Sequence, residues 1–337
     1  MAQRARDLGL VIGGGETGPR NAITDVAGVT VGHVTRSEPD QGIQTGVTVI
    51  KPHSGNLYSQ PVPAMVHVGN GFGKFIGLSQ VCELGELETP IAITNTLNAP
   101  QAASGLIEQT LAESSEALSV NPVVGEINDG KVNAIRERVV APGDTQHAWF
   151  NASELCPEGN VGAGTGGEAY GWKGGVGTAS RVVDLEGVPY TVGMLTVTNL
   201  PGQFAPRGIA LVGEPPTASS SGGKGSIIMV IATDAPVCPG NLGRMASRSL
   251  LGVARTGTIM PNGSGDYAIA FSTKRRERAN DQALLKPSAH VANQAMDPLF
   301  EASVEAAEEA VLNAMVAAET VETPIGTLRR YPFEPMG

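Results

Sequence analysis

The chain has 337 residues, enough for one large domain or two ordinary ones. Hydrophobic residues at 41% and charged residues at 17% indicate a folded globular protein and exclude a disordered one. The net charge of -10 argues against nucleic acid as a partner, because phosphate binding requires clustered Lys and Arg. No apolar run approaches the roughly 18 residues of a membrane span, and the N-terminal run is too short for a signal peptide. We therefore expect a cytoplasmic protein with no membrane partner.

Short β-branched runs bounded by Gly, Pro, Asn or Asp predict strands. The first series comprises residues 28–35, 45–50, 63–70 and 90–96, and the second comprises 173–183, 190–199, 225–234 and 265–273. Apolar periodicity predicts helices over 102–118, 242–256 and 297–320, with a shorter one within 73–82. Strands followed by helices favour mixed α/β layers in one domain that spans 1–337. The one stretch that resembles a linker is 213–225.

The cysteines and histidines do not have the spacing of a metal site. The cysteines are Cys82, Cys156 and Cys238, and the histidines are His33, His53, His67, His147 and His290. An odd, sparse set of cysteines predicts buried thiols in a reducing compartment rather than disulfides. The short basic run 274–278 contains Glu277 and is interpreted as a solvated loop, or else as a contact between subunits.

Two glycine-rich stretches, 13–18 and 162–167, match the GxGxxG pattern of dinucleotide-binding proteins. In those proteins the third glycine opens a helix whose N-terminus holds the pyrophosphate. Neither stretch here is followed by a helical pattern, so the glycines are expected to form turns and to allow close backbone contacts. We accordingly expect neither a cofactor nor a metal.

Polar residues stand at the ends of several predicted strands. Glu126 follows an apolar run and precedes Asn128 and Asp129, and Asn199 ends a strand before a Pro-Gly turn. Ser264 and Asp266 stand where another strand begins. Each group could form a solvated turn or line a pocket, and taken alone none of them decides between the two.

At the junction of Gly225 and Ser226, a stretch with the composition of a flexible linker is followed directly by an apolar run that predicts a buried strand. A loop that leads into a strand would have this sequence. A self-cleaving serine enzyme would have it too: a serine that begins a chain can use its own α-amine as base, with a pKa of about 8. In that case the Ser226 hydroxyl attacks the Gly225 carbonyl, and water hydrolyses the resulting ester.

Several segments together resemble the family of L-aminopeptidase/D-amino-acid esterase-amidases and β-peptidyl aminopeptidases. They occur in the family's order over residues 7–320 and comprise 20–35, 45–50, 87–100, 123–133, 159–181 and 225–273. The resemblance implies self-cleavage into an α chain of residues 1–225 and a β chain of residues 226–337. Ser226 would be the N-terminal nucleophile of the β chain.

The resemblance also implies roles for the polar residues at the strand ends. Ser264 and Asp266 would orient the new α-amine and help to move the proton, and Asn199 would donate to the oxyanion. Glu126 would hold the ammonium group of the substrate, which is why such enzymes remove one N-terminal residue at a time. Some members of the family have an aromatic residue where Ile127 stands.

The family's fold is a four-layer α/β/β/α sandwich, which resembles the N-terminal-nucleophile hydrolases but connects its strands differently. Its members assemble as oligomers, expected here as a tetramer of αβ units. The implied function is hydrolysis of short peptides, amino-acid amides or esters that carry a free amine, β-amino-acid peptides among them. Two alternatives are an acyltransferase on the related self-cleaving scaffold, whose Thr nucleophile argues against it here, and a non-catalytic relative.

Overall fold

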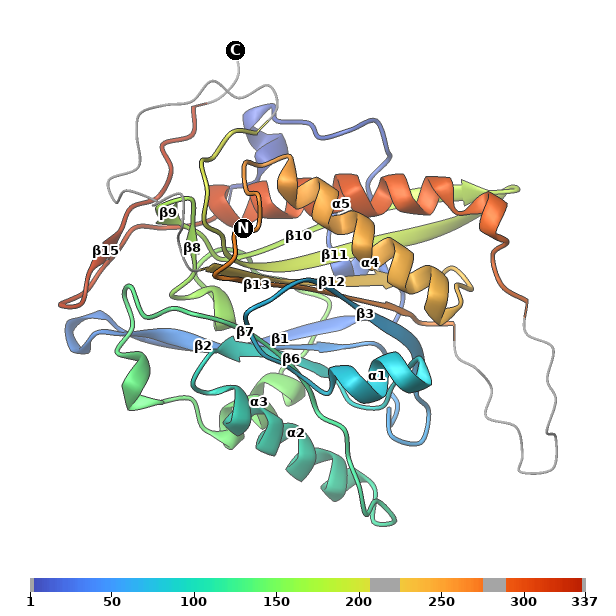
Figure 1. Cartoon of the computed structure of the whole chain (residues 1–337), viewed down its shortest axis with the longest axis horizontal. Helices are drawn as coiled ribbons and strands as arrows, with labels where there is room; N and C mark the ends of the chain where they lie inside the picture. Colours follow the sequence, from blue (N-terminus) through green and yellow to red (C-terminus); the bar gives the residue numbers. More distant parts are fainter. Residues whose placement is uncertain (1–2, 207–224, 275–288, 335–337) are drawn as a thin grey trace.

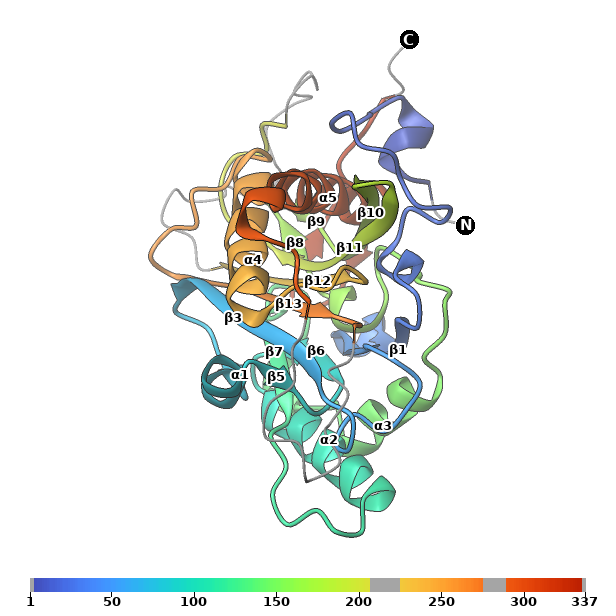
Figure 2. The ribbon, with the colours of Figure 1, turned by 90° about the vertical axis from the view of Figure 1, so that its right-hand side faces the viewer.

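The computed structural model describes residues 3–206, 225–274 and 289–334. Two β-sheets lie face to face, and helices cover the outer face of each sheet (Figure 1 and Figure 2). The layers therefore run α/β/β/α, which confirms the fold class expected from the sequence.

The larger sheet has six strands in the order β10-β11-β12-β13-β3-β5. Their bounds are Val176–Leu185, Val188–Asn199, Gly225–Thr233, Ser264–Ser272, Val62–Gly71 and Glu86–Leu87. β12 and β13 are parallel, and the other neighbours are antiparallel. The two strands that follow the linker, β12 and β13, thus lie between β11 and β3, which come from the first part of the chain.

The smaller sheet has five strands in the order β1-β2-β6-β7-β4. Their bounds are Thr30–Glu38, Ile43–Lys51, Ile91–Asn95, Val123–Ile127 and Phe75–Ile76. Only the β6–β7 pair is parallel. Two short ladders join β8 (Glu168–Ala169) to β9 (Trp172–Lys173) and β14 (Val321–Glu322) to β15 (Thr327–Leu328).

Helices α4 (Pro239–Ala254) and α5 (Asp297–Val316) pack on the larger sheet, and α2 (Ala99–Glu113) and α3 (Pro142–Phe150) pack on the smaller one. The short helix α1 (Leu78–Leu84) lies against β3 and β5. The sequence predicted α2, α4 and α5, but not α3. The helix expected within 73–82 begins only at Leu78, because Phe75 and Ile76 pair in β4 and Gly77 has φ +84.

Strand β12 is apolar on both faces because it lies between helices and the second sheet. One set of alternate side chains packs towards α4 and α5, namely Ile227, Met229 and Ile231. The other set packs between the two sheets, namely Ile228, Val230 and Ala232. Successive residues of a strand point to opposite faces, so Ser226 shares the face of Ile228 and points between the sheets.

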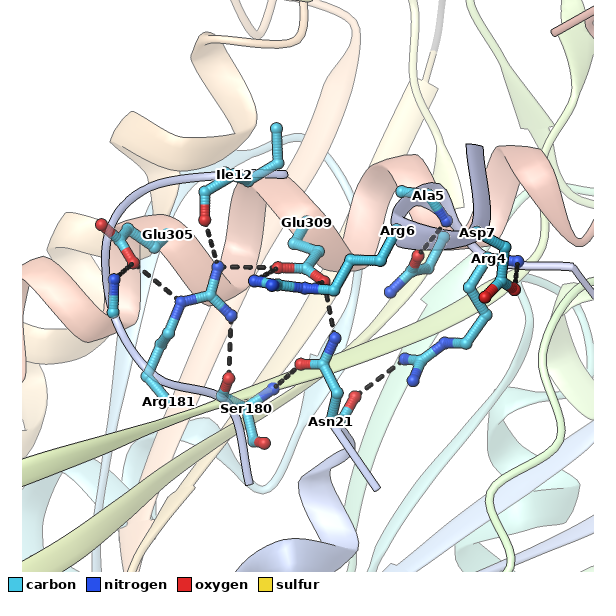
Figure 3. Close-up of polar contacts among 12 residues, drawn as sticks. Arg4, Ala5, Arg6, Asp7, Ile12, Asn21, Ser180, Arg181, Glu305 and Glu309 are labelled. Atoms are coloured by element: carbon cyan, nitrogen blue, oxygen red, sulfur yellow. Dashed lines mark hydrogen bonds and ion pairs between the residues drawn. The ribbon is translucent and has the colours of Figure 1, made fainter. Parts of the chain in front are cut away.

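An ionic cluster fixes the N-terminal segment to α5 (Figure 3). The buried guanidinium of Arg181, on β10, donates to Glu305 and Glu309 of α5, each at 2.7 Å, and Arg6 donates to Glu309 at 2.7 Å. Burial alone would raise the pKa of Glu309, but the hydrogen bond from Arg6 and the charge of Arg181 hold it below its usual value. The cluster pairs its buried charges, as a protein interior requires.

The three cysteines are free, and Cys82 is exposed while the other two are half-buried. The expectation of buried thiols is therefore wrong for Cys82. It lies on α1, where Val81 is the buried residue that anchors the helix to the sheet. Within the described ranges, no helix is both long enough and apolar enough to cross a membrane.

Candidate active site

The Gly225–Ser226 junction lies at the start of β12, in the middle of the larger sheet. The remainder of the predicted linker, residues 213–224, lies outside the described residues, as does all of the basic run except Lys274. The Gly225 amide donates to the Gly263 carbonyl at 3.3 Å. A Cβ at Gly225 would lie 2.7 Å from the Asn199 carbonyl oxygen and would overlap Pro201. Glycine is needed here because two chain segments approach closely.

Asn199 is the direct partner of Ser226 in the antiparallel β11–β12 ladder. Paired residues of a ladder point to the same face, and the Asn199 Nδ2 donates to the Ser226 Oγ at 3.3 Å. Both side chains are buried. An amide donor at this distance from a hydroxyl could also donate to an oxyanion that forms on the carbon attacked by that hydroxyl.

Ser264 and Asp266 begin β13, the parallel neighbour of β12, and Ser264 is the ladder partner of Gly225. The Ser264 hydroxyl donates to Asp266 Oδ1 at 2.7 Å, and both residues are completely buried. Burial raises the pKa of Asp266 to about 6, although the hydrogen bond from Ser264 opposes this rise. The other carboxyl oxygen, Oδ2, has no hydrogen-bond partner within the described part of the chain. It could accept one more donor.

The two pairs point to opposite faces of the same sheet. Asp266 alternates with Tyr267, which packs between the sheets, so Asp266 points towards the helix layer. Ser226 and Asn199 point the other way. The structure thus brings Asn199 to the hydroxyl of Ser226, whereas it pairs Ser264 with Gly225 and Asp266 with Ile227, the two residues that flank Ser226.

Glu126 is the penultimate residue of β7 in the second sheet, and its side chain is only 4% exposed. Its Oε1 accepts the backbone N–H of Lys74 at 2.9 Å, and its Oε2 accepts the hydroxyl of Thr96. The exposed Lys74 ammonium lies 4.0 Å from Oε1. These donors hold a nearly buried carboxylate in a fixed position, from which it could bind a second cation.

Gly73 lies between Glu126 and the strand pair that carries Ser226. A Cβ at Gly73 would lie 3.0 Å from Glu126 Oε1 and 3.2 Å from the Cα of Gly265, which is the ladder partner of Ser226. The Tyr267 hydroxyl donates to the Gly73 carbonyl at 2.8 Å. The carboxylate of Glu126 and the backbone of Gly265, beside Ser226 in the sheet, therefore both lie close to Gly73.

Sequence reasoning did not identify the residues that surround Glu126, namely Gly73, Lys74, Thr96 and Tyr267. The available signals were the glycines of the 69–73 stretch and the polar end of the 90–96 strand. Ile127 is completely buried between the sheets. As the next residue of the strand, it points to the opposite face of the sheet from Glu126. An aromatic side chain at this position would have to fit within the core between the sheets.

The second glycine-rich stretch packs tightly against neighbouring backbone. Gly162–Gly164 form a single 3-10 turn, and a Cβ at Gly164 would lie 2.6 Å from the carbonyl carbon of Gly175. This confirms the interpretation of these glycines as sites of close backbone contact.

Solved structures with this fold are similar along nearly the whole chain. The L-aminopeptidase D-Ala-esterase/amidase of Ochrobactrum anthropi is 37% identical with a TM-score of 0.85, over 97% of this chain and 95% of that one. It is described as a prototype for the serine aminopeptidases and a new variant of the Ntn hydrolase fold. The PH0078 protein from Pyrococcus horikoshii OT3 is 41% identical with a TM-score of 0.88, over 98% and 96%. The present chain therefore has a fold like that of the N-terminal-nucleophile (Ntn) class of hydrolases.

The sequence comparisons agree with this class of hydrolases and identify a peptidase family within it. The β-peptidyl aminopeptidase BapA of Sphingosinicella microcystinivorans is 38% identical over 98% of this chain and 89% of that protein. The model of peptidase family S58 matches residues 21–329. The chain belongs to peptidase family S58 and is a hydrolase.

Proposed function

We propose that residues 1–337 form one catalytic domain, a self-processing serine aminopeptidase and amidase. It removes the N-terminal residue from short peptides, amino-acid amides or esters, β-amino-acid peptides among them. The observation that best supports this is the hydrogen bond from Asn199 to Ser226 at the start of a central strand. A buried serine hydroxyl with a fixed amide donor has the two groups that acyl transfer requires on one face.

The first reaction is proposed to be self-cleavage. The Ser226 hydroxyl attacks the Gly225 carbonyl carbon, and Asn199 stabilises the resulting oxyanion. The C–N bond between the two residues breaks, the acyl group remains on Oγ, and the hydroxyl proton passes to the departing nitrogen. Water then hydrolyses the ester, which leaves a carboxylate on Gly225 and a free α-amine on Ser226.

Turnover repeats this chemistry on a substrate. Glu126 binds the ammonium group of the substrate. The Ser226 hydroxyl attacks the substrate carbonyl, and the α-amine of Ser226 accepts the proton that this hydroxyl loses. The proton passes to the leaving amine, and water hydrolyses the acyl-enzyme. Ser264 and Asp266 pair with Gly225 and Ile227, which flank Ser226, and the free Oδ2 of Asp266 is available to accept a hydrogen bond from the new amine.

The intact mass of the purified, denatured protein tests self-cleavage. We expect two chains, residues 1–225 and 226–337, with the smaller one beginning Ser-Ile-Ile-Met. A single species near 34.6 kDa that persists on long incubation would contradict the proposal.

The rate of self-cleavage should rise with pH through about 6. Burial raises the pKa of Asp266 to about 6, so only above that pH does it carry the negative charge that would stabilise the protonated nitrogen departing from Gly225. Ser264→Ala removes the hydrogen bond that lowers this pKa, so the midpoint should move to higher pH. Mass spectrometry of precursor that is first held at low pH and then transferred to buffers from pH 4 to 8 gives the rates. A midpoint that Ser264→Ala moves downwards would contradict this role for Asp266.

Glu126→Gln should weaken substrate binding but leave self-cleavage intact. The amide keeps an acceptor for Lys74 N–H and loses the charge that pairs with the ammonium group of the substrate. A desolvated charge pair that loses one partner costs about 2–5 kcal/mol, so KM should rise roughly a hundredfold with little change in kcat. Steady-state kinetics on an amino-acid amide measures the effects on KM and kcat separately.

The matched control is Glu308→Gln, which neutralises a buried carboxylate in the helix layer that pairs with Arg255 at 3.2 Å. Its KM should be that of the wild type. If Glu126→Gln lowered kcat alone, or blocked self-cleavage, Glu126 would not be the ammonium-binding group.

We further propose that the processed chains assemble in the cytoplasm as a homo-oligomer, a tetramer of αβ units. Support comes from large apolar side chains exposed on and near the α2–α3 layer, namely Leu111, Leu118, Phe150 and Leu155. Light scattering of the processed protein would give the mass of the assembly.

A further inference from the structure

An exposed lysine accompanies the carboxylate of Glu126. The Lys74 ammonium lies 4.0 Å from Oε1, and its side chain is 60% exposed while that of Glu126 is 4% exposed. A nearly buried negative charge therefore has an exposed positive charge as its partner.

Lys74 disfavours a substrate that carries only an ammonium group. Such a group must approach the carboxylate that Lys74 already accompanies, and two like charges near one carboxylate repel each other. The Lys74 backbone N–H would continue to hold Oε1, but the Lys74 ammonium would have to move towards solvent and lose its partner. A substrate that brings its own negative charge would give that ammonium group a new partner.

One class of acyl residue places the two charges side by side. In a β-aspartyl peptide, the carbon that carries the ammonium group also carries a free carboxylate, and it is separated from the scissile carbonyl by one methylene. The residue is thus a β-amino acid whose substituent is a carboxylate. Its ammonium group would bind to Glu126 and its carboxylate to Lys74, while its carbonyl would extend past Gly73 towards Ser226.

We propose that this site selects N-terminal residues that carry a carboxylate beside the ammonium group, with β-aspartyl peptides as the substrate class. The inference rests on the proposed aminopeptidase function. Lys74 is then a specificity-determining residue rather than a participant in the chemistry, because it touches a substituent of the substrate and none of the reacting atoms.

The test compares two dipeptides that differ in one charge, β-aspartyl-alanine and its analogue in which the α-carboxylate is a carboxamide. The processed wild type should prefer the carboxylate by about two- to fivefold in kcat/KM, the range of a partly exposed ion pair. The preference should shrink as salt is added, because exposed charges are screened. Lys74→Met should abolish the preference, and Lys74→Arg should retain it.

The control is Lys131→Met, which removes a half-exposed lysine from a similar pair with the nearly buried Glu168. It should leave the preference unchanged. A wild type that cleaves the carboxamide as fast as the carboxylate, or a preference that survives in Lys74→Met, would overturn the inference and leave the aminopeptidase proposal standing. A wild type that cleaves neither dipeptide nor any amino-acid amide would overturn both.

Discussion

Ser226→Ala is expected to give a single uncut chain of 337 residues without measurable hydrolysis. The hydroxyl serves both proposed reactions, as the nucleophile on Gly225 and then as the nucleophile on the substrate. An enzyme without its nucleophile typically loses about 10⁶-fold in kcat. Intact mass and turnover of an amino-acid amide would be measured on the same sample, so that each step is assessed separately.

The control for this variant is Ser249→Ala. Ser249 is a buried serine of α4 whose hydroxyl donates to the Ala246 carbonyl at 2.7 Å, so its loss removes one buried hydroxyl away from the proposed site. This variant should cleave itself and turn over substrate as the wild type does. If Ser226→Ala were cut or active, another residue would have to be the nucleophile.

Asn199→Ala is expected to slow both self-cleavage and turnover by about 10²–10³-fold. Both reactions pass through an oxyanion next to the Ser226 Oγ, and the loss of one donor to an oxyanion typically has this cost. The loss should appear in kcat with KM little changed, because the bond strengthens as the charge develops. The measurements are the rate at which the precursor disappears and steady-state kinetics on the processed fraction.

Asn241→Ala provides the control, because Asn241 is a buried asparagine of α4 whose Nδ2 donates to Asn293 at 3.0 Å. It should leave both rates near those of the wild type. If Asn199→Ala instead raised KM and kept kcat, Asn199 would contribute to substrate binding and not to the oxyanion.

The sequence predicted the strands and long helices well because their patterns are local. β12 shows this clearly, since its uninterrupted apolar run requires packing on both faces. Helix α3 was missed because its nine residues include Gly143, Asp144, Gln146 and His147, and its apolar side chains form no clear stripe. The pairing of β12 with β11 and β13 depends on long-range contacts, which no local pattern contains.

The candidate site was predicted in part from strand ends and in part from resemblance to a family. That Ser226 and Asn199 share a face follows from a ladder register between residues far apart in sequence. The position of Asp266 on the opposite face follows from a second register, that of β12 with β13, and its raised pKa follows from complete burial. The support of Glu126 by Thr96 and by the Lys74 backbone joins three separate segments, so sequence alone could not have revealed it.

The position of β12 and β13 between β11 and β3 affects whether the protein can refold after it unfolds. A precursor that unfolds can refold, because every strand of the larger sheet belongs to one chain. After the proposed cleavage at Gly225, the two central strands would belong to one polypeptide and their neighbours to another, so refolding would require two fragments to meet in solution. The lifetime of the mature protein would then be set by its rate of unfolding and not by its equilibrium free energy of unfolding.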